Sequence, residues 1–586
     1  MAKEPVTGEH VIGVKTIAQG KPDQFGEPVV TMLVCFLFSP ARLRVHWAPG
    51  FPCALCLLRH SFLAKLGRYL RRENAESHLE FLVIASHPAA LCADRVARND
   101  GGVSRYPDKT TITHLPRNGP TMQTPREILA DLWMLAGGEA SALDAVRLAG
   151  EEPQLPSSFR VAAAAQASIA AAGLAAAEVW KLRSGEVQDV AVGMVHAVAE
   201  CRSERYMRVD GKPPPPAWDP TAGIYRTRDH RFVRLHTNFP HHRAAVCKVL
   251  ACKAERDDIQ AALMQWDGEA FETAAYAGGA VVALMRSRDE WSATPHAKAL
   301  SQLPTLSIEK IGEAPPRPWP AGDRPLAGVR VLDLSRVIAG PVAGRTLAAH
   351  GADVLLISGP DLPAIPWLTI DTGRGKLTTF IELKREQGRG TLRDLLARAD
   401  ILSQGYRPRA IASLGFSPED AAKLNPGIVY VSLSAYGHVG PWSERRGFDS
   451  LVQTTTGFNH AEGQAAGIDG PKELPAQMLD HATGYLMAFG AMMAKARQSR
   501  EGGSWHVRVS LAQTGRWLWN VGRVAGGLKT EELKGETVRP FLEEVPSGFG
   551  TLRAVSHSAV LSKTPASWTR PAMPLGSHAP QWPARG

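Results

Sequence analysis

The residue whose type and position could do covalent chemistry is Asp480, which opens the helical stretch DHATGYLMAFGAM. Free backbone amides and the helix dipole favour an anion at the start of a helix, so we expect this carboxylate to be ionised. An ionised carboxylate can attack an activated carbonyl group and form a covalent intermediate. It can equally serve as a plain helix cap, and position alone favours the cap.

Cysteine and histidine groups are weaker candidates for chemistry. Cys53 and Cys56 form a C-x-x-C pair, but no second pair or spaced histidines complete a zinc site, so we expect no metal. We expect the histidines of HTNFPHHR to be structural or interface residues: His236, His241 and His242. The odd number of cysteines predicts reduced thiols and a cytoplasmic location. They are Cys35, Cys53, Cys56, Cys92, Cys201, Cys247 and Cys252.

The elements that would position Asp480 alternate between strands and helices. Apolar runs predict strands at 329–334, 353–357, 401–404 and 428–434, with helices between them that include 387–398 and 418–424. Pro341 opens the first of these helices and Gly351 ends it. This alternation predicts an α/β fold with a Rossmann-like, largely parallel sheet, accompanied by a smaller α+β domain.

Two stretches of the chain look alike. Residues 480–515 and 163–198 each contain an Ala-rich helix, a turn with glycine and a short strand. Aligned without gaps, Asp480 falls opposite Ala163. We interpret this as a duplicated unit in which the second copy alone keeps the carboxylate, although any two helix–strand units share such a pattern.

A more specific resemblance is carried by ordered motifs between residues 326 and 492. They are LAGVRVLDLSRVIAGPVAGRTLAAHG (326–351), IELK (381–384), GYRP (405–408), NPGIVYVSLSAYG (425–437), RGFDSLVQ (446–453) and LDHATGYLMAFGAM (479–492). In this order they resemble the family III CoA-transferases, which include formyl-CoA transferase, carnitine CoA-transferase and alpha-methylacyl-CoA racemase. Residues 218–310 resemble the family's smaller domain, which here precedes the intact catalytic segment.

The resemblance implies an acyl-CoA:carboxylate CoA-transferase. CoA would move from an acyl-CoA thioester to a small carboxylic acid through a covalent intermediate on Asp480, with CoA as a substrate and no permanently bound cofactor. A homodimer is also implied. The implied CoA contacts are Ile338, Ala339, Ile381, Glu382, Leu383, Lys384, Gly405, Tyr406, Arg407, Arg446, Gly447, Phe448 and Asp449. Lys384, Arg407 and Arg446 could neutralise the CoA phosphates.

Two alternatives stay open. One is a racemase or isomerase of the same family, although racemases place a histidine where this chain has Phe448, and moving an α-proton needs two flanking groups. The other is a non-catalytic CoA-binding paralogue. Two departures motivate caution about the site: the basic residue expected near Ser358 is missing, and the glycine-rich loop that covers the aspartate has no clear counterpart.

Composition sets outer limits on these predictions. The chain has 586 residues, 44% of them hydrophobic, and a net charge of +10, which favours an anionic partner. The positive charge is scattered, so we expect a phosphorylated small molecule and no nucleic acid. We expect no membrane association, because the longest strongly apolar run, 29–38, is too short to cross a bilayer.

The motifs and linkers divide the chain into six parts. We expect an uncertain extension at 1–121, with the native start near Met122. The other parts are a degenerate large-domain remnant (122–212), a small α+β domain (213–312), a Pro-rich linker (313–325), the catalytic large domain (326–528) and an extended tail (529–586).

Overall fold

The structure is a computed structural model that describes residues 122–584. The predictions about a start near Met122 and about the Cys53–Cys56 pair concern residues 1–121 and lie outside the described residues. Within the described part, Cys201, Cys247 and Cys252 are free thiols.

A seven-stranded sheet forms the centre of the fold, in the order β10-β9-β8-β11-β12-β13-β7. The strands are β7 (Leu306–Gly312), β8 (Arg330–Leu334), β9 (Asp353–Ser358), β10 (Lys376–Phe380), β11 (Ile401–Gln404), β12 (Val429–Ser434) and β13 (Ser504–Ser510). All neighbours are parallel except β13 and β7. The predicted α/β fold with a largely parallel sheet is confirmed. The strand order reverses between β8 and β11, and sheets of this kind bind ligands at the carboxyl ends of such strands.

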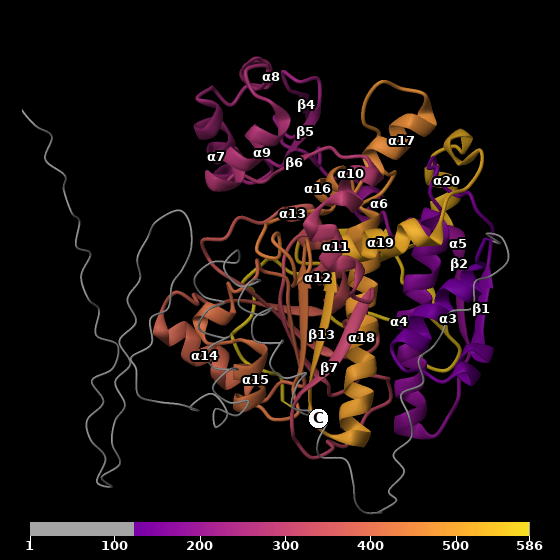
Figure 1. The fold of residues 1–586 in the computed structure, drawn as a ribbon. Helices are drawn as coiled ribbons and strands as arrows, with labels where there is room; N and C mark the ends of the chain where they lie inside the picture. Colours follow the sequence, from indigo (N-terminus) through magenta and orange to yellow (C-terminus); the bar gives the residue numbers. More distant parts are fainter. Residues whose placement is uncertain (1–121, 585–586) are drawn as a thin grey trace, which may run out of the picture. The chain divides into compact units, whose positions relative to one another are not determined.

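Alternate side chains of the strands pack against different helices. Leu332, Leu355 and Leu402 contact α14 (Glu386–Leu396) and α15 (Pro418–Leu424) on one face. Val331 and Val429 face α12 (Ala339–Ala349) and α18 (Met478–Glu501) on the other. Figure 1 shows α14 and α15 on the opposite side of the sheet from α18. Strands buried on both faces explain the continuous apolar runs of the sequence.

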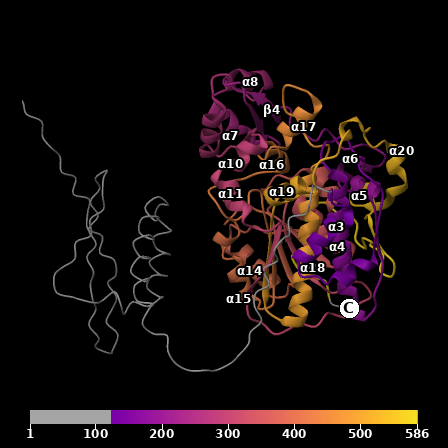
Figure 2. The ribbon, with the colours of Figure 1, turned by 45° about the vertical axis from the view of Figure 1, so that its right-hand side comes forward.

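The amino-terminal half surrounds one long buried helix, α4 (Val161–Ser184). It begins with α3 (Pro125–Leu135), where Thr124 and Glu127 form a capping box. Its other elements are η4 (Ala140–Ala145), β1 (Val146–Ala149), β2 (Val190–Gly193), α5 (Met194–Glu200), α6 (Ser203–Tyr206) and β3 (Arg208–Val209). By length and composition α4 could cross a membrane, but 94% of its most apolar window is buried inside the protein. It lies beside α18 in both views (Figures 1 and 2).

The two halves repeat the same helix–strand–helix unit. The offset that aligns Ala163 with Asp480 also aligns both ends of α4 with both ends of α18. It aligns the first residue of α5 with the first residue of α19 (Leu511–Val521). It further pairs Gly173 with Gly490, and a Cβ added at either glycine would meet the equivalent valine of the following strand, Val190 or Val507. Chance similarity between two helices does not produce these matched close approaches, so we infer a duplication.

A smaller unit of three antiparallel strands and helices lies between the two copies. Its elements are β4 (Gly223–Arg226), β5 (Phe232–Leu235), β6 (Val282–Leu284), α7 (Pro240–Leu250), α8 (Arg256–Leu263), α9 (Gly268–Ala277), α10 (Arg288–Ala293) and α11 (Pro295–Ser301). The sequence analysis ends the small domain at residue 312 and so includes β7 in it. In the structure β7 pairs with β13 and belongs to the edge of the large sheet. An apolar alternation alone does not reveal which sheet a strand joins.

The carboxyl-terminal tail completes the amino-terminal half. It contains α20 (Gly535–Val538), β14 (Leu542–Ser547), β15 (Gly550–Val555) and β16 (Ala559–Leu561). β16 pairs antiparallel with β2, and β15 pairs antiparallel with β3. β16 therefore occupies in the first copy the place that β7 occupies in the second, beside β13. Each half is closed by a strand that reaches it from elsewhere in the chain.

Candidate active site

Asp480 lies in the first turn of α18 and is 7% exposed. Its backbone N–H donates to Oδ2 of Asp449 at 2.9 Å. Asp449 begins α16 (Asp449–Thr455), is fully buried, and accepts a second hydrogen bond from the side chain of Gln453. Asp449 therefore satisfies the free backbone N–H of Asp480, and the N-cap residue of α18 is Gln477, so Asp480 is not the helix cap.

The two carboxyl groups share a site with little solvent. Burial raises the pKa of Asp449 to about 6. Burial also raises the pKa of Asp480 well above its ordinary value, and the charges of Asp449 and Glu204 raise it further. Carboxyl groups with strongly raised pKa values in a shared site are typical of catalytic centres.

The loop after β8 brings the start of α12 against Asp480. A Cβ added at Gly484, one turn along α18, would lie 2.5 Å from the carbonyl oxygen of Ala339. Val337 in this loop has φ 74°, a left-handed conformation that strains a β-branched residue. Such strain is typical of functional sites, where the surrounding structure holds the backbone in place. The glycine at 484 thus lets the predicted CoA-binding residues Ile338 and Ala339 approach the first turns of α18, where Asp480 lies.

Three arginines from different loops lie near one another. Burial and then the charge of Arg407 lower the pKa of Arg446. Burial lowers the pKa of His241 in α7, and Arg446 and Arg336 lower it further. Within residues 122–584, neither Arg407 nor Arg446 forms an ion pair with a carboxylate. Unpaired like charges at the carboxyl edge of a parallel sheet favour an anionic ligand.

A small cavity of about 30 Å³ opens between the ends of β8 and β9. Ser335, Arg336, Ser358 and Leu362 are among its lining residues. Arg336 stacks over Phe239 and donates to the carbonyl oxygen of Pro363. The sequence lacks a basic residue after β9, and Arg336 supplies a cation at the same place from β8. Its position directly after a buried strand was the signal for it in the sequence.

The predicted CoA contacts fall in loops at the same edge of the sheet, but their side chains differ in availability. Ile381, Leu383 and Tyr406 pack into the apolar core, so contacts there would use backbone atoms. Lys384 and Arg407 are exposed, and Glu382 pairs with Arg385 at 2.7 Å. A Cβ built at Gly405 would lie 3.6 Å from Cβ of Ser335, so the ends of β8 and β11 lie close together.

The turn before α16 contains the remaining predicted contacts. Arg446 and Gly447 are half-buried, while the Phe448 ring stacks on His236 with centroids 3.7 Å apart. Asp449 differs from the prediction, because both of its carboxylate oxygens are engaged by Asp480 and Gln453. Its side chain holds the start of α18 in place, a role that spacing along the sequence does not reveal.

The amino-terminal half supplies a residue that the sequence did not indicate. Oε2 of Glu204 lies 3.3 Å from Nε2 of His481, the neighbour of Asp480. Nδ1 of His481 is buried with no hydrogen-bond partner in the described part of the chain. Glu204 and His481 are 277 residues apart, so no local pattern could have paired them.

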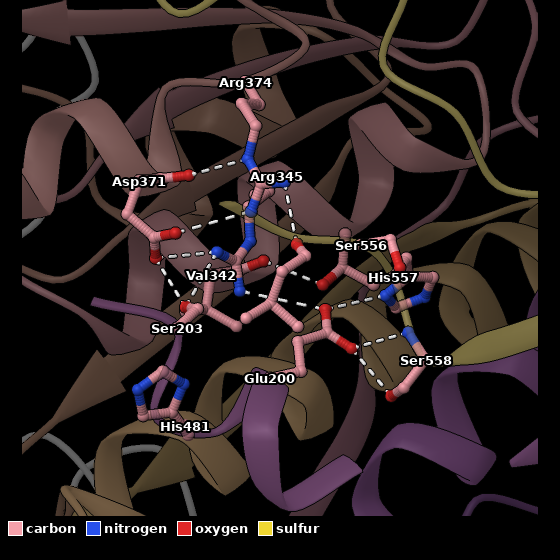
Figure 3. A network of polar contacts seen from close by, with 12 residues as sticks. Glu200, Ser203, Val342, Arg345, Asp371, Arg374, His481, Ser556, His557 and Ser558 are labelled. Carbon is pink, nitrogen blue, oxygen red and sulfur yellow. Dashed lines mark hydrogen bonds and ion pairs between the residues drawn. The ribbon is translucent and has the colours of Figure 1, made fainter. Parts of the chain in front are cut away.

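A buried network joins α5 to α12 and to the carboxyl-terminal tail. Arg345 of α12 lies between Asp371 of α13 (Pro366–Thr372), at 2.7 Å, and Glu200 of α5, at 3.8 Å. Glu200 also contacts His557 and Ser558 of the tail (Figure 3). Burial alone would raise the pKa of Glu200, but His557 and Arg345 hold it well below its ordinary value. Three segments far apart in sequence thus meet behind the site.

Comparison with known proteins gives a family match for the segment that contains Asp480. The family model described as CoA-transferase family III matches residues 326–539. This segment is therefore similar to CoA-transferase family III. The matched residues include Asp480, the three loop arginines and the strained turn at Val337. Glu204 and the histidines of the smaller unit, His236 and His241, lie outside the matched segment.

Curated relatives carry transferase names. The acetyl-coenzyme A transferase nodX of Hypoxylon pulicicidum is 29% identical over 321 residues, 50% of this chain and 54% of that protein. A probable fatty acyl-CoA transferase of Mycobacterium tuberculosis is 32% identical over 32% of this chain and 50% of that protein. Its crystal structure matches at 31% identity and a TM-score of 0.32, covering 34% of this chain and 56% of that one. The match therefore spans about half the length of these relatives.

Proposed function

We propose that this chain is a family III CoA-transferase that moves CoA from an acyl-CoA thioester to a carboxylic acid through a covalent intermediate on Asp480. The observation that carries the proposal is the buried carboxylate of Asp480, whose backbone N–H donates to Asp449 at 2.9 Å. A buried carboxylate in the first turn of a helix, next to a second buried carboxylate, has the position and surroundings of a nucleophile.

The reaction would begin at the thioester carbonyl carbon. An oxygen of Asp480 attacks it, the carbon–sulfur bond breaks, and CoA leaves as a thiolate with an aspartyl acyl anhydride on the enzyme. The thiolate then attacks Cγ of Asp480 and releases the donor acid. The acceptor carboxylate attacks Cγ of the resulting aspartyl thioester, the carbon–sulfur bond breaks, and CoA thiolate leaves as a second anhydride forms. The thiolate finally attacks the acceptor's carbonyl carbon, which releases the carboxylate of Asp480 and yields the acceptor's CoA thioester. CoA is a substrate throughout, and no step needs a resident cofactor.

Arg336, Arg407 and Arg446 would bind the phosphates of CoA. They come from the loops after β8 and β11 and from the turn before α16, and so surround the point where the strand order reverses. The fork of donors on a guanidinium suits phosphate oxygens. The small unit contributes His241 and Phe239 beside these arginines.

Two substitutions separate chemistry from binding. Asp480→Ala is expected to abolish label transfer from acyl-CoA to a panel of carboxylic acids and the hydroxylamine-trappable adduct, while CoA binding persists. Arg446→Ala and Arg407→Ala are expected to weaken CoA binding by about 10- to 100-fold each, the loss of a charged hydrogen bond. Arg409→Ala is the matched control, because Arg409 already pairs with Glu444 at 2.7 Å.

The outcomes distinguish the alternatives. Wild-type transfer rates in Asp480→Ala would exclude Asp480 as the nucleophile. Exchange of the α-proton in D2O without CoA transfer would indicate a racemase, which Phe448 at the position of the racemase histidine argues against. CoA binding without any exchange across the acid panel would indicate a binding protein.

A further inference from the structure

A cavity of about 120 Å³ lies between the small unit and the carboxyl-terminal half. Three helices line it: α10 and α11 from the small unit, and α19, which follows the last strand of the large sheet in sequence. Figures 1 and 2 show α10 and α11 beside α19. The cavity shares no lining residue with the predicted CoA contacts. Its volume is roughly ten times what one water molecule needs, so a small organic molecule can enter it.

Each of the three helices places one cation at this cavity. They are Arg288 of α10, Lys298 of α11 and Arg516 of α19. Arg516 is engaged, since it donates to the carbonyl oxygens of Leu300 at 3.2 Å and Ser301 at 2.6 Å. Within residues 122–584, the side chains of Arg288 and Lys298 form no hydrogen bond and no ion pair. Two cationic groups at the cavity are therefore available to a ligand.

The surroundings of Arg288 favour an anion. The guanidinium is half-buried and lies over the ring of Trp519, 4.9 Å from its centroid. Burial, and then the charge of Arg516, lower the pKa of Arg288, whereas Asp289 raises it. Asp289 is exposed and does not line the cavity, and adjacent residues of a helix point apart. An anion inside the cavity would relieve the repulsion between these cations.

The floor of the cavity is apolar. It consists of four buried side chains: Trp291, Ala297, Leu300 and Ala512. Gln513 is also buried there, but its oxygen accepts a hydrogen bond from Ser510 at 2.7 Å and its nitrogen donates to the carbonyl oxygen of Pro304. The floor therefore suits a hydrocarbon group, while the cations suit a negative charge.

We propose that this cavity binds a short-chain carboxylate, with its hydrocarbon chain against Trp291 and its carboxylate beside Arg288 and Lys298. The fork of donors on a guanidinium matches the two oxygens of a carboxylate. Burial of the chain on the apolar floor adds to the affinity. The site goes beyond the proposed transfer at Asp480, and the ligand is bound here without any covalent step.

The test is ¹⁹F NMR of the full chain labelled with 5-fluorotryptophan, in which the Trp291 signal is assigned by its loss in Trp291→Phe. Titration with millimolar butyrate should shift this signal along one saturable curve. Butyramide keeps the chain and lacks the charge, whereas inorganic phosphate keeps a charge and lacks the chain. Each should bind about tenfold more weakly than butyrate.

Substitutions locate the bound carboxylate. Arg288→Gln should weaken butyrate binding about tenfold, and Arg288→Lys, which keeps the charge, should restore most of it. Lys298→Gln, at an exposed position, should weaken binding about 2- to 5-fold. Ala512→Leu would fill the cavity and should abolish the shift. Lys563→Gln is the matched control, because Lys563 pairs with Glu186 at 3.2 Å outside the cavity, and it should leave binding unchanged.

Circular dichroism checks that each variant folds, and the exposed Lys298 provides a test that does not depend on the half-buried Arg288. A Trp291 signal that butyrate does not move overturns the proposal, as does a shift that Arg288→Gln and Lys298→Gln both leave unchanged. Equal binding of butyramide, or tighter binding of inorganic phosphate, overturns the assignment to a carboxylate with a chain. Because the readout is binding at Trp291, it is independent of whether Asp480 transfers CoA.

Discussion

Asp480 and Asp371 are both buried aspartates, but their surroundings predict opposite effects when the charge is removed. Asp371 is paired with Arg345 at 2.7 Å and Arg374 at 3.4 Å, whereas the groups that act on Asp480 are carboxylates. A buried charge among like charges destabilises the fold, and a buried charge between arginines supports it. Catalytic residues often carry such a cost in stability.

We predict that Asp480→Asn raises the free energy of unfolding at neutral pH by roughly 1–3 kcal/mol. The pKa of Asp480 is raised in the folded protein, so as pH rises the unfolded chain releases this proton first and stability falls. The gain should therefore be present at pH 7 and vanish below about pH 4, where both states keep the proton. Urea titrations across this pH range measure it.

Asp371→Asn is the matched contrast for that prediction. It should destabilise by about 3–5 kcal/mol, because two buried arginines lose their partner. If Asp480→Asn instead lowered stability at pH 7 as Asp371→Asn does, Asp480 would be a structural cap and not a strained nucleophile.

At the scale of elements, two glycines allow the long helices to approach the strands that follow them. A Cβ at Gly490 would lie 2.6 Å from Cγ1 of Val507 and 3.1 Å from Cδ1 of Leu306. Gly490→Ala should therefore lower the free energy of unfolding by about 1–3 kcal/mol through overpacking. Gly390→Ala in α14 has nothing within 4 Å and should stabilise by up to about 1 kcal/mol.

Thermal and urea unfolding of the two glycine variants would check the prediction. Equal and small effects would mean that α18 shifts away from β13 at little cost, and the close approach would then not explain why both copies keep a glycine at this position.

The elements nearest Asp480 were predictable because their signals are local. Apolar runs gave β8, β9, β11 and β12 to within a few residues. The gapless alignment of Ala163 with Asp480 was sufficient to predict the equivalent helices. These features depend on neighbours in sequence, which a single chain displays directly.

The remaining parts depend on contacts between distant residues. β7 and β16 are short strands whose sheets are chosen by partners that lie elsewhere in the chain. The hydrogen bond from Asp480 to Asp449 and the pair between Glu204 and His481 both arise from tertiary packing. The types of side chains and their spacing along the sequence do not indicate contacts between such distant residues.

At the scale of the molecule, the two copies exchange their closing strands. The strand after the small unit, β7, completes the sheet of the second copy, and β16 from the tail completes the sheet of the first. Residues just after each copy's helix pair also reach the start of the other copy's long helix, as Glu204 does for α18 and Val521 does for α4. One chain thereby builds an internal pair of halves with an aspartate at a single position.

This arrangement predicts one reactive centre per chain. Because Ala163 occupies the aspartate position of the first copy, hydroxylamine trapping during turnover should add one hydroxamate to each 586-residue chain. Intact-mass measurement gives the number, and peptide mapping should place it on the peptide containing Asp480. Asp480→Asn should carry none. A second modified site in the amino-terminal half would show that the first copy retained a nucleophile other than the aspartate, and the two halves would then have to be treated as two enzymes that share one chain.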